Sequence, residues 1–107
     1  MSEENIKSLI EKFDLEWLEG GFLYQLRECH FDVRGYMRLE SLFHTLKQLD
    51  DNTSELINRD LVRVIWFIPQ FVEWQCERVI ERGGDAEVVH SAASNLRELV
   101  GEALGEP

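Results

Sequence analysis

The stretch from Leu61 to Val72 constrains the fold most, because it is apolar at nearly every position. A helix that is apolar on all sides is typical of the central, surrounded helix of a small domain. Pro69 removes one backbone hydrogen bond from this helix, so we expect a kink or a break near residues 65–68. The predicted central helix spans about residues 60–82 and ends at the glycine pair 83–84.

The other segments place apolar residues at steps of three and four, which is the spacing of one helical face. This spacing predicts further helices over residues 3–18, 22–28, 33–49 and 86–103. Asp32 and Asp85 precede two of them and are candidate N-caps. No segment alternates apolar and polar residues as a strand does. The 107 residues therefore predict one all-α domain, residues 1–107, built as a single compact bundle of four to five helices with orthogonal or irregular packing.

The charge balance limits the classes of partner. There are 21 Asp and Glu residues against 11 Lys and Arg, a formal net charge of −10 at pH 7. Nucleic-acid binding depends on Lys and Arg, and anionic membrane surfaces also attract cations, so neither partner is expected. An excess of carboxylates instead favours a basic protein partner.

The sequence indicates a cytoplasmic protein. The first residues are acidic and lack the basic start and unbroken apolar run of a signal peptide. The longest apolar run, Val64 to Ile68, is far shorter than a bilayer span. Cys29 and Cys76 lie within apolar stretches and are expected to be core thiols of a reducing compartment.

Candidate catalytic and metal-binding groups are scarce, so we predict no enzyme, no cofactor and no metal. No carboxylate, Cys or second His follows His30, His44 or His90 at the i+3 or i+4 spacing that would place two metal ligands on one helical face. Cys76 is followed by Glu77, whose negative charge would raise the pKa of the thiol and reduce its reactivity. A small enzyme or ligand-binding bundle stays an alternative, and it would need a buried polar cavity around His44, Tyr24 or Tyr36.

Acidic residues gather in three places, two of them beside a tryptophan that is a candidate binding hot spot. The first group lies at the end of the first helix, the second in the loop after the third helix, and the third is a ridge along the second half of the central helix. We predict that these groups contact a cationic protein partner. The predicted contact residues are Asp14, Glu16, Trp17 and Glu19; Asp50, Asp51 and Glu55; and Glu73, Trp74, Glu77 and Glu81.

Two stretches resemble a known family. They are DLEWLEGGFLYQLRECHFD, residues 14–32, and LVRVIWFIPQFVEWQCERV, residues 61–79. Through their WLEGGF and IPxFxEWQ patterns they resemble bacterial immunity proteins encoded beside polymorphic toxins, including those of contact-dependent growth inhibition. The resemblance implies a cytoplasmic antidote without catalytic residues, which binds and blocks the C-terminal toxin domain of its own strain. The shared positions are expected to be structural: Trp17, Gly20, Gly21, Phe22, Pro69 and Trp74.

A nuclease is the toxin activity that fits this charge best, because an RNase or DNase is basic where it holds phosphates. Two other interaction functions stay open. One is a helical adaptor with a basic cellular partner, which would show an apolar groove with acidic residues on its rim. The other is a nucleic-acid mimic, for which the ridge of Glu73, Glu77 and Glu81 is short.

Overall fold

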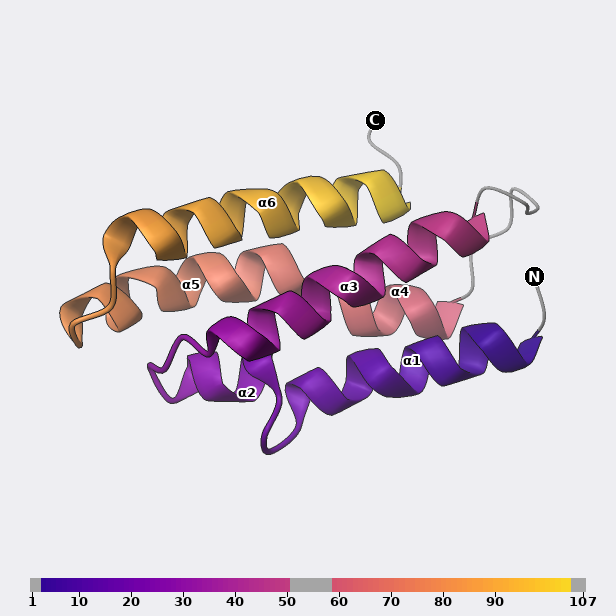
Figure 1. Ribbon diagram of the computed structural model, residues 1–107, viewed down its shortest axis with the longest axis horizontal. Coiled ribbons are helices and arrows are strands. Elements are labelled where there is room, and N and C mark those ends of the chain that lie inside the picture. The colour runs from indigo at the N-terminus through magenta and orange to yellow at the C-terminus, as the bar shows by residue number, and fades with distance from the viewer. Residues whose placement is uncertain (1–2, 51–58, 105–107) are drawn as a thin grey trace.

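The structure, a computed structural model, describes residues 3–50 and 59–104, and every regular element in these ranges is an α-helix. The all-α prediction is confirmed, and the outer boundary of each predicted segment lies within one residue of the observed one. None of these helices is long and apolar enough to cross a lipid bilayer. The helices are α1 (Glu3–Trp17), α2 (Phe22–Arg27), α3 (Val33–Asp50), α4 (Arg59–Ile65), α5 (Ile68–Glu81) and α6 (Ala86–Leu104), as Figure 1 shows.

The predicted central helix is divided in two, which brings the described helices to six. α4 ends at Ile65 and α5 begins at Ile68, with Trp66 and Phe67 in the turn between them. Pro69 lies in the first turn of α5, where the missing N–H has no intrahelical partner to lose. The segment is less enclosed than its apolar sequence predicts, because Trp66 is 58% exposed.

The helices form four rods around one core. α1 packs on α3, α3 on α6 and α6 on α5, while α4 returns to α1 and so closes the ring. α4 and α5 lie end to end as one of the four rods (Figure 1). The short α2 packs against α1, α3 and α5 and fills the space between them.

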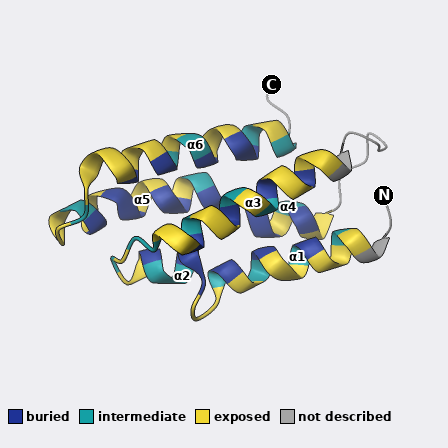
Figure 2. Cartoon of the chain, in the orientation of Figure 1, coloured by how far each residue is buried: buried dark blue, intermediate teal, exposed yellow. Residues whose placement is uncertain are grey.

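The core is made by the inward stripes of all six helices, which are dark blue in Figure 2. The rings of Phe13 and Phe43 meet edge to face at 5.0 Å and join α1 to α3. Phe22, the first residue of α2, is fully buried and touches the rings of Phe31 and Tyr36. The short α2 therefore adds one of the largest side chains to the core.

Local signals fix where the helices stop and start. Gly20 and Gly83 have φ values of +89° and +99°, a left-handed conformation that glycine adopts at little cost, and they follow α1 and α5. The carboxylate of Asp85 accepts hydrogen bonds from the N–H groups of Glu87 and Val88 at 3.0 and 3.3 Å. The predicted cap at the start of α6 is therefore confirmed.

Substitutions at two nearby positions of α1 should change the stability of the protein by very different amounts. Phe13 is fully buried, whereas Leu15 is mostly exposed. Phe13→Ala is expected to lower the free energy of unfolding by about 3–5 kcal/mol, because it removes a ring and leaves a cavity. Leu15→Ala should change that free energy by less than about 0.5 kcal/mol. Urea denaturation monitored by circular dichroism measures both variants, and equal losses would contradict this packing.

Candidate functional site

Exposed aromatic side chains gather at the junction of α4 and α5. Trp66 is 58% exposed and Trp74 is 59% exposed. The ring of Phe67 lies between them, with its centroid 5.3 Å from that of Trp66 and 5.4 Å from that of Trp74. The three residues form one continuous patch, which we call the aromatic surface.

The aromatic surface has a fixed backing. The indole of Trp17 stacks on Phe67 at 6.3 Å and meets Phe71 edge to face at 5.0 Å. Its Nε1–H donates a hydrogen bond to the carbonyl oxygen of Val64 at 2.9 Å, which ties α1 to α4. Trp17 is half-buried and packs behind the rings, while Trp66 and Trp74 are each more than half exposed.

A carboxylate flanks the aromatic surface on the side of α1. Asp14 lies 3.4 Å from Nη2 of Arg63, and both side chains are about half-exposed. A shallow hollow of about 460 Å³ joins this pair to the aromatic rings. It is lined by Asp14, Trp17, Arg63, Val64, Trp66 and Phe67.

A second hollow, of about 540 Å³, lies between α5 and α6 on the side of Trp74. Glu73 and Glu77 line it, together with His90 and Arg97 of α6. Glu73 accepts a hydrogen bond from Arg97. Glu77 and Glu81 form no ion pair within the part of the chain that the structure describes, so the acidic ridge keeps unneutralised charge beside the aromatic surface.

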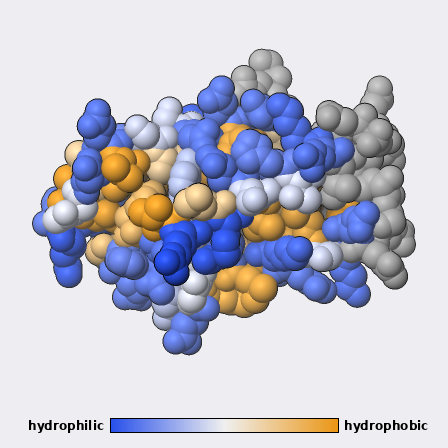
Figure 3. Space-filling model, in the orientation of Figure 1, coloured by the Kyte–Doolittle hydropathy of each residue, from blue (hydrophilic) through white to orange (hydrophobic). Residues whose placement is uncertain are grey.

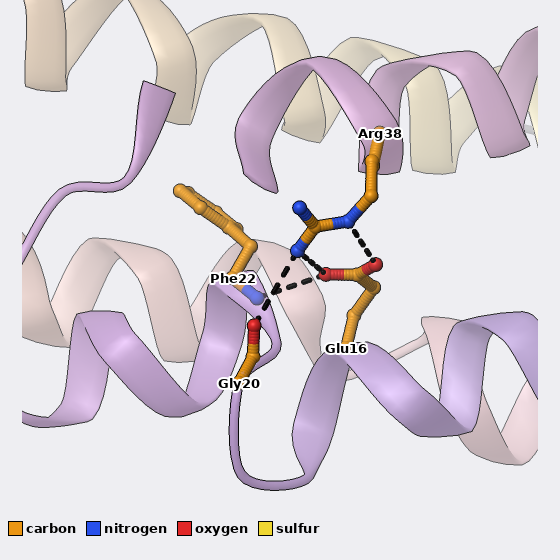
Figure 4. A network of polar contacts seen from close by, with 4 residues as sticks. All are labelled: Glu16, Gly20, Phe22 and Arg38. Carbon is orange, nitrogen blue, oxygen red and sulfur yellow. Dashed lines mark hydrogen bonds and ion pairs between the residues drawn. The ribbon is translucent and has the colours of Figure 1, made fainter. Parts of the chain in front are cut away.

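Glu16 is not a surface contact, which corrects the expectation from sequence. It is only 5% exposed and lies under Arg38 of α3 (Figure 4). Its Oε1 accepts the N–H of Phe22 at 2.8 Å, and Arg38 binds both carboxylate oxygens at 3.1 Å through Nε and Nη2. The hydrogen bonds that Arg38 donates to Glu16 raise the pKa of Arg38, which keeps the guanidinium charged. This carboxylate is an internal structural group.

The remaining predicted contact residues do not all meet. Glu19 lines a separate groove between α1 and α3. Asp50 ends α3 and its side chain is not described, while Asp51 and Glu55 lie outside the described residues. The structure therefore brings Asp14 and Trp17 together on one side of the aromatic surface, and Glu73, Trp74 and Glu77 on the other.

Sequence reasoning missed Trp66 and Phe67 as surface residues. Both lie in an apolar run, and such a run predicts burial. A signal was present in the spacing, because Trp74 follows Phe67 by seven positions and therefore shares its helical face. Nothing in the run itself shows which neighbouring helix would leave that face uncovered.

Cys76 and Tyr36, two polar side chains that could take part in chemistry, are buried or hydrogen-bonded to a neighbouring helix. Burial raises the pKa of the Cys76 thiol, and nearby Glu73 adds to the effect, so the thiolate is disfavoured at neutral pH. Tyr36 and Glu40 of α3 both accept hydrogen bonds from Asn95 of α6, at 2.6 and 2.7 Å. Burial raises the pKa of Tyr36 as well. Within residues 3–50 and 59–104, no three His, Cys, Asp or Glu side chains are grouped to hold a metal ion.

Comparisons of the chain with protein-family models, with curated proteins and with solved structures found no match. The function is therefore argued from the residues of this chain.

The contribution of the buried Glu16 to stability can be tested by comparing its substitution with that of Glu19, an exposed glutamate nearby. Glu16→Gln should lower the free energy of unfolding by about 1–3 kcal/mol, because the neutral amide loses the ion pair and its NH2 group, in place of Oε2, cannot accept the hydrogen bond from Nε of Arg38. Glu19→Gln is the matched control and should change it by less than about 0.5 kcal/mol. Urea denaturation of both variants decides the point, and similar values for the two would show that the Glu16 network adds nothing to stability.

Proposed function

We propose that this chain is an immunity protein that binds a cognate basic toxin domain, a nuclease, and neutralises it by direct 1:1 contact. The observation that carries the proposal is the aromatic surface, in which Trp66 and Trp74 are both more than half exposed beside carboxylates. Tryptophan is the residue type most enriched at the energetic centres of protein interfaces.

The aromatic surface suits the centre of an interface. Each tryptophan presents a large apolar area that gains free energy when a partner removes it from water. Since Phe67 and Trp17 support the rings from behind, little side-chain entropy is lost on binding. The carboxylates then form a polar rim around an apolar centre, which is the usual organisation of protein interfaces.

The charge of the rim selects a cationic partner. The net charge of −10 draws basic proteins toward the chain and speeds their encounter. Asp14 and Glu73 are paired with Arg63 and Arg97, but these pairs are about half-exposed and such pairs contribute only about 0–1 kcal/mol each. A lysine or arginine of the partner can therefore replace the internal cation at small cost.

A nuclease is the toxin class that this arrangement fits best. The active site of a nuclease must carry cations that hold phosphates, and the carboxylates of this chain can bind the same cations. Protection of the producing cell requires tight binding, so we expect an interface of about 1,600 Å² and a nanomolar Kd.

Co-expression with the protein encoded immediately upstream tests the proposed role. Growth rescue together with co-purification of a 1:1 complex is the expected result. Toxicity that persists in the presence of a folded chain, or a Kd only in the micromolar range, would refute it. A complex with a basic protein that has no toxic activity would instead favour the helical adaptor.

The aromatic surface makes a specific prediction for that complex. Trp66→Ala and Trp74→Ala should each weaken binding of the toxin domain by about 2 kcal/mol, close to thirtyfold. Val88→Ala on α6 is the control, because Val88 is also an exposed apolar residue but lies outside the aromatic surface. Isothermal titration calorimetry gives the three affinities. Equal losses for all three variants would place the interface elsewhere.

Charge steering makes a separate prediction about association kinetics. Raising NaCl from about 0.01 to about 1 M shortens the Debye length from about 30 to about 3 Å. The association rate constant should fall by about tenfold or more over this range, while the dissociation rate constant changes less. Stopped-flow fluorescence measures both constants. A flat association rate would remove charge steering from the proposal and leave the antidote role standing.

A further inference from the structure

A second surface lies on another side of α1. It is a groove of about 940 Å³ between α1 and α3, which we call the α1–α3 groove. Its apolar lining includes Leu15 and Met37, which are 60% and 62% exposed, and the half-buried Leu42. Figure 3 shows apolar surface between these two helices with strongly hydrophilic surface beside it. Exposed apolar side chains of this size, grouped in one groove, are typical of a binding surface.

The charge of the α1–α3 groove is opposite to that of the molecule. Lys12, Arg34 and Arg38 line it, against the carboxylates of Glu16 and Glu19. Glu16 is already bound to Arg38. Lys12 and Arg34 form no ion pair with any residue that the structure describes. Glu19 is likewise without an ion pair among the described residues, so the lining carries three cations against two carboxylates. In a chain with almost twice as many acids as bases, an apolar groove whose lining is net cationic points to an anionic partner.

The α1–α3 groove is already formed in the free protein. The hydrogen bonds of Glu16 to Arg38 and to the N–H of Phe22 hold α1, α3 and the start of α2 together beneath it (Figure 4). Nη2 of Arg38 also donates to the carbonyl oxygen of Gly20 at 3.5 Å. A preformed groove binds with less ordering cost than one that must open.

We propose that the α1–α3 groove binds an acidic amphipathic helix of a protein partner. Its lining along α3 runs from Arg34 to Thr45, about 17 Å or three helical turns at the usual rise per residue. A helix of this length places apolar side chains at positions i, i+3 or i+4, and i+7 against Leu15 and Met37, and flanking carboxylates at Lys12 and Arg34. The proposal does not rest on the immunity function, because it concerns a different surface and a partner of the opposite charge.

Two synthetic peptides test the proposal on the full chain. Each has about 14 residues, with leucine on one helical face, and the flanking positions are glutamate in the first peptide and lysine in its twin. Attraction by the overall net charge of −10 favours the lysine peptide, whereas attraction by the cations of the groove favours the glutamate peptide. The two causes therefore predict opposite orders of affinity. We expect the glutamate peptide to bind at least about tenfold more tightly, measured by fluorescence anisotropy. Tighter or equal binding of the lysine peptide, or no binding of either, would overturn the proposal.

Variants locate the binding site. Arg34→Glu and Leu15→Ser should each weaken the glutamate peptide by about tenfold or more. Arg82→Glu makes the same charge change at an exposed position at the end of α5 and should alter binding less than about twofold. Chemical-shift perturbations on the unmodified protein should fall on Leu15, Met37 and Leu42. Perturbations confined to the indoles of Trp66 and Trp74 would overturn the proposal even if the glutamate peptide binds, whereas loss of toxin binding in Trp74→Ala bears only on the immunity function.

Discussion

One buried carboxylate organises this small bundle. Glu16 accepts hydrogen bonds from the N–H of Phe22 and from Nε and Nη2 of Arg38, so a single side chain fixes the end of α1, the start of α2 and the first half of α3. Taking a carboxylate out of water is costly unless its oxygens are hydrogen-bonded, and here Oε1 accepts two hydrogen bonds and Oε2 one. Phe22, whose N–H this carboxylate binds, is fully buried, and Glu16 and Arg38 also line the α1–α3 groove.

Much of the fold could be predicted because its signals are local. Apolar spacing, helix-stopping glycines, the Asp85 cap and Pro69 all act within a few residues, and each gave the observed helix or break. The site depended on tertiary contacts and was harder to predict. Glu16 follows Phe13 by three positions, so it lies on the buried face, yet only the position of Arg38 explains why a charge is tolerated there. Trp66 was expected to be buried because it lies in an apolar run. Such a run does not show which of its residues a neighbouring helix will leave uncovered.

The two surfaces described above differ in chemistry as well as in place. The aromatic surface combines indole rings with carboxylates, whereas the α1–α3 groove combines aliphatic side chains with cations. α1 contributes to both from different sides, with Asp14 and Trp17 toward the first and Lys12 and Leu15 toward the second. The contacts proposed for a basic partner and for an acidic one are thus kept apart on a single helix.

The exposure of Trp66 and Trp74 has an evolutionary consequence. Their rings rest on the bundle without filling its interior, whereas Phe13, Phe22 and the Glu16 network carry the packing. Mutations can therefore accumulate at the outward positions while the scaffold keeps its shape. Substitutions at these outward positions can alter what the aromatic surface binds while the packing beneath it is kept.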